Sequence, residues 1–117
     1  MAASPIVRLR RICLALPEAE EVETWATPTF RIRGKIFALA SERDGAPAVW
    51  VKAPQGVQDL LLEAAPDRFF RPPYLGGRGW VGVRLSGADP EELTALIRRS
   101  YSLIAPRALA ARVAMDA

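Results

Sequence analysis

Apolar residues recur at helical spacing near both ends of the chain. Ser4 suits an N-cap and Pro5 the first helical position, which predicts a helix from about Pro5 to Leu16. Its buried stripe is Ile6, Leu9, Ile12, Cys13 and Leu16. Asp89 and Pro90 begin a second helix in the same way. The stripe of that helix is Leu93, Leu96, Ile97, Tyr101 and Ile104, and Pro106 then starts a short final helix to about Val113.

The middle of the chain alternates between apolar and polar residues, as half-buried strands do. Strands are predicted over residues 29–33, 36–40 and 48–52, with tight reversals at Gly34-Lys35 and Asp44-Gly45. A helix from Pro54 to Pro66 and strands at 69–71 and 80–85 follow. The pattern predicts an α+β fold with two layers, in which an antiparallel sheet of about five strands is covered by helices.

Two segments between these elements carry further expectations. The acidic run from Glu18 to Glu23 is interpreted as a solvated connector that leads into the first strand. Trp50 lies between Val49 and Val51, so either its ring or the two valines must pack. We expect Trp50 to be structural.

The segment from Phe69 to Trp80 combines four aromatic residues, two arginines, three glycines and two prolines, and it contains no acidic residue. Prolines restrict the backbone and glycines allow close approach, which favours an ordered loop. Such a loop can present arginines and aromatic faces to a phosphate-bearing or planar partner. A well-packed connection, with its aromatic residues in the core, explains the same composition.

The composition is that of an ordinary globular protein, with 117 residues, 50% hydrophobic and 25% charged. We expect one domain over residues 1–117. Cys13 is the single cysteine and cannot form an internal disulfide. Residues 1–5 lack the apolar core of a signal peptide, and no apolar run reaches membrane-spanning length. We therefore expect a cytoplasmic protein with no membrane partner.

The net charge is only +3, but 14 of the 16 cationic residues are arginines, the exceptions being Lys35 and Lys52. Arginine suits phosphates and aromatic faces, although a GC-rich genome would produce the same bias. Basic residues concentrate in the strands and after the middle helix, while acidic residues lie elsewhere. This segregation indicates either a one-sided basic surface or the solvated face of a sheet.

Residues for common chemistry are missing. The chain has no histidine, and Cys13 lies in an apolar stripe, so neither a zinc site nor a cysteine nucleophile is expected. The run Gly76-Gly77-Arg78-Gly79 lacks the spacing of nucleotide-binding loops. We expect a protein that is not an enzyme and has no cofactor or metal.

The order of several short motifs resembles the MmcQ/YjbR family. In the first half the motifs are Leu16-Pro17-Glu18, Thr27-Pro28-Thr29-Phe30-Arg31 and Gly34-Lys35-Ile36-Phe37-Ala38, with Trp25 between the first two. In the second half they are Phe70-Arg71-Pro72-Pro73-Tyr74-Leu75-Gly76, Gly79-Trp80-Val81 and Ser100-Tyr101. The resemblance implies a frataxin-like or double-wing α+β fold and DNA binding. Thr27 stands where the family often has a histidine, so no imidazole is available there.

The basic residues and the loop together give a candidate site for double-stranded DNA. Its residues are Arg31, Arg33, Lys35, Lys52, Arg71, Tyr74, Arg78 and Trp80. The cations would contact phosphates, and the two aromatic rings would stack. Binding would be weak and sensitive to salt. Two alternatives use the loop at 69–80 instead, either as the anchor for a protein partner or as the cover of a small-ligand pocket.

Overall fold

Six strands form one antiparallel sheet in the order β1-β2-β3-β4-β6-β5. The structure is a computed structural model that describes residues 4–115. Residues 1–3 and 116–117, which belong to the predicted domain, lie outside the described residues. The helices are α1 (Pro5–Leu14), α2 (Val57–Ala64), α3 (Pro90–Ile104) and α4 (Arg107–Met115), with a 3₁₀ turn at Gly76–Arg78. The strands are β1 (Glu20–Thr24), β2 (Thr27–Ile32), β3 (Lys35–Arg43), β4 (Ala46–Lys52), β5 (Phe69–Phe70) and β6 (Trp80–Arg84). The predicted α+β class and antiparallel sheet are confirmed.

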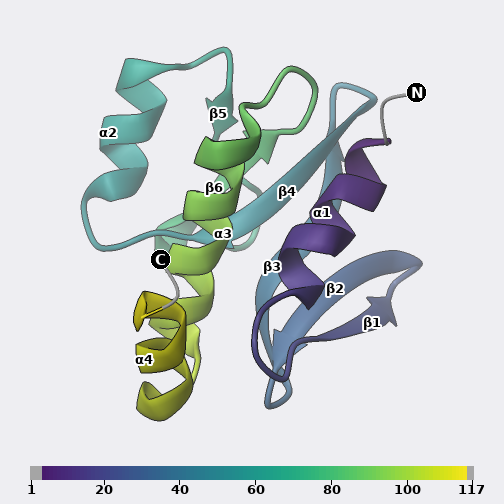
Figure 1. Ribbon diagram of the computed structural model, residues 1–117. Coiled ribbons are helices and arrows are strands. Elements are labelled where there is room, and N and C mark those ends of the chain that lie inside the picture. The colour runs from purple at the N-terminus through teal and green to yellow at the C-terminus, as the bar shows by residue number, and fades with distance from the viewer. Residues whose placement is uncertain (1–3, 116–117) are drawn as a thin grey trace.

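One face of the sheet is covered by helices. Figure 1 shows α1 and α3 side by side in front of β3 and β4, with α4 below α3 and α2 beside β5. The core between the layers includes Phe37, whose ring meets that of Tyr101 edge-on with centroids 5.3 Å apart. Ser100 on α3 ties the layers together, because its hydroxyl donates to Phe37 O at 2.6 Å and accepts from Lys52 N at 2.9 Å. The opposite face of the sheet carries no helix in Figure 1 and is called the open face.

The helix boundaries follow local chemistry. The Ser4 hydroxyl accepts a hydrogen bond from Val7 N at 3.3 Å, and the Asp89 carboxylate accepts one from Glu91 N at 3.2 Å, as the N-cap predictions require. The middle helix begins at Val57, later than predicted from Pro54, because Gly56 has a φ of +83° and interrupts the helical backbone.

The interpretation of residues 18–23 as a connector is wrong, because Glu20–Thr24 is the edge strand β1. It pairs with β2 through a two-residue turn at Trp25 and Ala26, which have φ of +52° and +60°. Its acidic side chains are exposed, and Glu21 accepts a hydrogen bond from Arg10 of α1 at 2.9 Å. Charged edge strands resist pairing with other chains, and they lack the apolar alternation by which strands are recognised.

The register of the strands brings distant residues to the same end of the sheet. Ile32 pairs with Lys35, Ala38 with Val51, and Lys52 with Trp80. The β2–β3 turn, the end of β4 and the start of β6 therefore share one end. The turns at residues 25–26 and 44–45 lie at the other. No helix within residues 4–115 is long and apolar enough to span a membrane.

Candidate nucleic-acid interface

The six cations among the eight predicted site residues lie at the sheet end where the β2–β3 turn, β4 and β6 meet. We call this set the basic end, and its members are Arg31, Arg33, Lys35, Lys52, Arg71 and Arg78. They come from three strands, one turn and the loop between β5 and β6. The structure therefore gathers cations that the sequence spreads over 48 positions, from 31 to 78.

Three of these cations line a hollow of about 510 Å³, here called the basic hollow. Lys52 contributes from the end of β4, and Arg71 and Arg78 contribute from the loop. The other lining residues are Ala53, Gln55, Gly56, Gln58, Asp59, Gly76, Gly77 and Gly79. Asp59 is the one carboxylate among the described lining residues, so the hollow keeps an excess of positive charge. Its glycines leave the backbone accessible, which suits close approach of a phosphate.

Local contacts fix the loop that carries Arg71 and Arg78. The buried side chain of Gln58 donates from Nε2 to Gly76 O at 2.8 Å and to Trp80 O at 2.5 Å. The stem of Arg71 lies against Gly76, where an added Cβ would be only 2.6 Å from the arginine Cγ. Glycine at this position is therefore required by the path of the arginine side chain.

The other three cations differ in the hydrogen bonds that they already form within the chain. Arg31 is half-buried on the open face, where its guanidinium donates to Thr29 Oγ1 at 3.1 Å and Thr24 Oγ1 at 2.9 Å. Arg33 forms two hydrogen bonds with Glu18, at 2.9 and 3.1 Å. This pairing lowers the pKa of Glu18 and raises the pKa of Arg33. Lys35 is exposed at the turn.

The two predicted stacking residues have opposite environments. Tyr74 is 94% exposed, as a stacking residue must be. Trp80 is only 8% exposed, so the prediction that its ring is available to a ligand is wrong. Trp80 begins β6 and the preceding loop folds over it, with Trp80 N donating to Leu75 O at 3.4 Å. Trp80 pairs with Lys52 and, like Trp50 two residues along β4, lies on the open face, where its own loop covers it.

A second, largely apolar hollow of about 630 Å³ lies on the open face. We call it the aromatic groove. Its lining residues are Thr24, Trp25, Thr27, Ile36, Leu39, Ser41, Trp50, Tyr74 and Leu75. The sequence prediction included only Tyr74 of these as a site residue. Apolar residues on both faces of β3 and β4 were the available signal, because an uncovered sheet face is normally polar.

Trp50 lies in this groove and outside the helix-covered core. Val49 and Val51 on either side of it are fully buried against the helices, while Trp50 is half-buried on the open face opposite Gly82. Its indole Nε1 is buried and has no hydrogen-bond partner among residues 4–115. The sequence left two alternatives, in which either the Trp50 ring or the two valines pack in the core. The structure shows the second.

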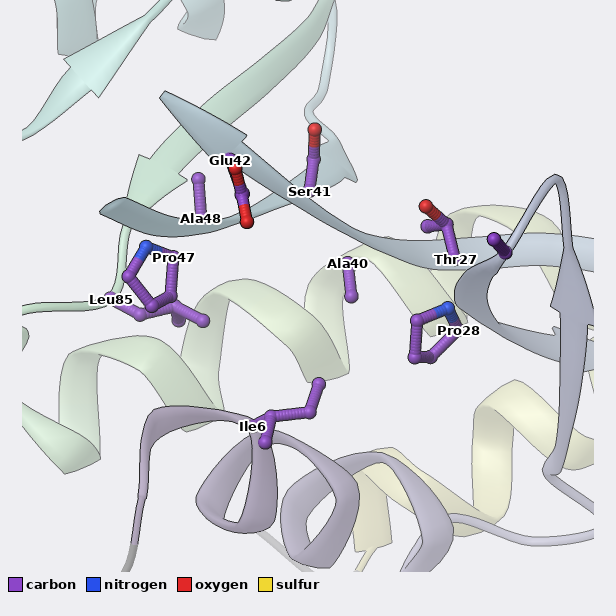
Figure 2. Close-up of a pocket in the computed structure, with 10 residues that line it drawn as sticks. Ile6, Thr27, Pro28, Ala40, Ser41, Glu42, Pro47, Ala48 and Leu85 are labelled. Atoms are coloured by element: carbon purple, nitrogen blue, oxygen red, sulfur yellow. The ribbon is translucent and has the colours of Figure 1, made fainter. Parts of the chain in front are cut away.

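A third hollow, of about 510 Å³, lies between α1 and the ends of β2, β3 and β4. Figure 2 shows Ile6, Pro28, Ala40, Pro47 and Leu85 around it, with the hydroxyl groups of Thr27 and Ser41 directed away. Glu42 is the only charged residue among its described lining residues. This hollow therefore lacks a cation for a phosphate-bearing ligand.

The thiol and the carboxylates of the described residues do not come together as a metal or nucleophile site. Cys13 is fully buried, and burial together with Glu21 raises the pKa of its thiol well above the ordinary range. Within residues 4–115 no cluster of three or more carboxylate or cysteine ligands could hold a metal ion.

Comparison with known proteins identifies the relatives of this fold. The profile of the YjbR family matches residues 14–103. The chain belongs to the YjbR family. The uncharacterised protein YjbR of Escherichia coli K12 is 29% identical over 100 residues, which cover 82% of this chain and 83% of the relative. The matching YjbR protein of Escherichia coli O157:H7 gives the same values.

A solved structure supports the same assignment. The DUF419-domain protein DR2400 of Deinococcus radiodurans superposes with a TM-score of 0.76 and 25% identity. The superposition covers 88% of this chain and 82% of the other. The YjbR match runs from the end of α1 to the end of α3, so it contains the basic end and the aromatic groove.

Proposed function

We propose that this YjbR-family protein is a DNA-binding protein and not an enzyme, and that the basic end receives the phosphates. The observation that carries the proposal is the convergence of Lys52, Arg71 and Arg78 on one hollow. Lys52 reaches it from a strand and the arginines reach it from a loop held by Gln58. Cations fixed on ordered elements form phosphate contacts with little loss of conformational freedom.

Non-enzymatic function is supported by the chemistry of the chain. It has no histidine, its cysteine is buried as a thiol with a raised pKa, and the basic hollow combines cations with backbone groups. These groups bind and orient an anion, and the hollow offers no evident general base or nucleophile apart from Asp59. A DNA ligand also fits the cytoplasmic location expected from the sequence.

The number of available cations limits the strength of binding. The basic hollow supplies three, Lys35 is exposed and Arg31 is half-buried, whereas Arg33 is paired with Glu18. Three to five phosphate contacts on duplex DNA give a log–log salt dependence of about −3 to −5. Binding should therefore be measurable at low salt and weaken steeply as salt rises.

Fluorescence anisotropy with a labelled mixed-sequence DNA duplex tests the proposal. Lys52→Ala, Arg78→Ala and Arg71→Gln should each flatten the salt slope by about one unit. Glutamine is chosen at position 71 because its stem keeps part of the contact with Gly76. Arg11→Ala on α1 and Arg107→Ala on α4 remove exposed arginines from the helical layer and should leave the slope unchanged.

Other outcomes identify other functions. If the α1 and α4 variants flatten the salt slope as much as the variants of the basic end, DNA is attracted only by the overall charge of the protein. That result would reject the basic end as the site. No binding of duplex or single-stranded DNA at low salt would reject DNA binding. In that case the two alternatives for the loop, a protein partner or a small ligand, would become the leading explanations.

A further inference from the structure

The aromatic groove holds the two most exposed aromatic residues of the described chain. Trp25 is 87% exposed in the β1–β2 turn, and Tyr74 is 94% exposed in the loop before β6. Both line the same hollow although they come from distant parts of the sequence. Large aromatic side chains that remain in water around a hollow are typical of ligand-binding surfaces.

The backbone at both residues is strained. Trp25 has a φ of +52° and Tyr74 a φ of +66°, in the left-handed region that favours glycine. Holding a bulky residue there is unfavourable, and such strain concentrates at functional sites. Neither ring is buried in return, so packing within the chain does not explain why these aromatic residues occupy these positions.

The register gives the groove its shape. Its lining residues on β3 run from Ser41 to Ile36, a path of about 17 Å at the usual rise of a strand. Thr29 pairs with Leu39, which places the start of β2, and with it Trp25, toward the Ser41 end. Leu75 accepts from Trp80 N and Trp80 pairs with Lys52, so Tyr74 belongs to the Ile36 end. The groove is therefore elongated, with an aromatic residue toward each end and Trp50 between them.

The exposed rings of the groove select the kind of ligand that fits. Trp25 and Tyr74 present their aromatic faces to solvent beside the hollow. A flat aromatic ring stacks on such faces, whereas an aliphatic ligand would gain only the burial of apolar surface. Nucleobases are flat rings of this kind. The Nε1 of Trp50 is buried, so it takes no part in this contact.

The basic hollow adjoins the groove across a single loop. Leu75 lines the aromatic groove and the next residue, Gly76, lines the basic hollow. A ring seated near Tyr74 would leave its attached phosphates beside Lys52, Arg71 and Arg78. No acidic residue lines the groove among the described residues, so no carboxylate repels an approaching phosphate.

We propose that the aromatic groove receives unpaired nucleobases, so that the protein prefers single-stranded nucleic acid to duplex. This proposal rests on the proposed function, since the basic hollow holds the phosphates of the same strand. Bases in a duplex are paired and stacked, and a base reaches the groove only after both contacts are broken. An exposed sheet face with aromatic residues binds single strands by stacking.

The test compares three labelled DNA probes at low salt. They are a mixed-sequence single strand, the blunt duplex of the same sequence, and a single strand with abasic sites in place of its central bases. The single strand should bind about a hundredfold more tightly than either of the others, which is the effect of two base–aromatic stacks of about tenfold each. The abasic strand keeps the phosphates, so its weaker binding isolates the bases.

Variants locate the effect. Tyr74→Ala and Trp25→Ala should each weaken binding of the single strand by about tenfold and leave binding of the abasic strand unchanged. Tyr74→Phe should retain wild-type binding because it keeps the ring. Leu60→Ala removes another exposed apolar side chain, 64% exposed on α2, and should have no effect. Circular dichroism checks that each variant is folded.

The failures are distinguishable. If all three probes bind equally and Tyr74→Ala has no effect, the groove does not hold bases, while phosphate binding at the basic end stands. If no probe binds, both proposals are overturned. A dimer that Trp25→Ala and Tyr74→Ala dissociate would show that a second copy of the chain occupies the groove, and would also overturn this inference.

Discussion

Along β3 and β4, the residues that point toward the helices differ from their neighbours that point to the open face. Ala38, Val49 and Val51 are small and fully buried under α3, whereas Leu39 and Trp50 are larger and partly exposed. An uncovered face of an antiparallel sheet normally carries polar residues. The covered face therefore accounts for the fold, and the size and apolar character of the open face require another explanation, for which we propose a ligand.

The largest expected effect contrasts the two faces directly. Phe30 is fully buried on the covered face, so Phe30→Ala should lower the free energy of unfolding by about 3–5 kcal/mol. Leu39→Ala, on the open face, should cost about 1 kcal/mol because its side chain is already partly exposed. Urea denaturation measures both, and Phe30→Leu serves if the alanine variant does not fold. Equal costs would mean that the open face stabilises the fold as much as the core does.

A smaller effect is expected at Gly82, where the ring of Phe70 covers the open face. An added Cβ at Gly82 would lie 2.3 Å from atoms of the Phe70 ring, so Gly82→Ala should destabilise the protein by about 1–3 kcal/mol. Gly77→Ala meets nothing within 4 Å and is the matched control. Thermal denaturation compares the two. An unchanged midpoint for Gly82→Ala would show that the Phe70 ring moves freely and does not cover this part of the face.

The strain in the β1–β2 turn predicts a change of opposite sign. Ala26 has a φ of +60°, so Ala26→Gly should raise the free energy of unfolding by up to about 1 kcal/mol. Ala108→Gly, in the exposed helix α4, should lower it by about 0.5–1 kcal/mol. Both are measured by urea denaturation. Destabilisation by Ala26→Gly would mean that the left-handed backbone at this turn is not strained.

The smallest effect concerns pH at the basic end. The hydrogen bonds from Arg33 lower the pKa of Glu18 below that of a free glutamate, so this carboxylate stabilises the fold at neutral pH. Its contribution is complete above the unfolded pKa and disappears as pH falls through the lower, folded pKa. Urea midpoints measured between about pH 7 and pH 3 should therefore fall slightly more for the wild type than for Arg33→Gln. Parallel curves would contradict a stabilising pair.

The sequence predicted the parts of the fold that carry strong local signals. The hairpin at Asp44-Gly45 and the glycine turn at Gly34 were recognisable because glycine supplies the left-handed backbone that these turns require. The turn at Trp25 and Ala26 has the same kind of backbone without any glycine, and its strand is a run of exposed acids. Neither signal was present there, so β1 was missed.

The residues of the candidate loop could be predicted from the sequence, but their arrangement in space could not. Arg71, Tyr74 and Arg78 could be selected from the composition of their loop. Which of them meet Lys52, and which faces Trp50, depends on strand register, which local patterns do not determine. Composition did not predict the exposure of Trp80. A tryptophan next to a glycine-rich loop has the same local sequence whether the loop exposes the ring or covers it.

The two hydrogen bonds from Gln58 have a consequence for the speed of binding. They anchor Gly76, the first residue of the 3₁₀ turn, and Trp80, two residues after it, before any ligand arrives. The entropy of ordering this loop is then lost during folding and not during association. Association should accordingly occur in a single step whose rate follows diffusion and salt, without a slow loop rearrangement. If Gln58 were replaced, the loop would become ordered only when the ligand binds. The association rate would then be lower.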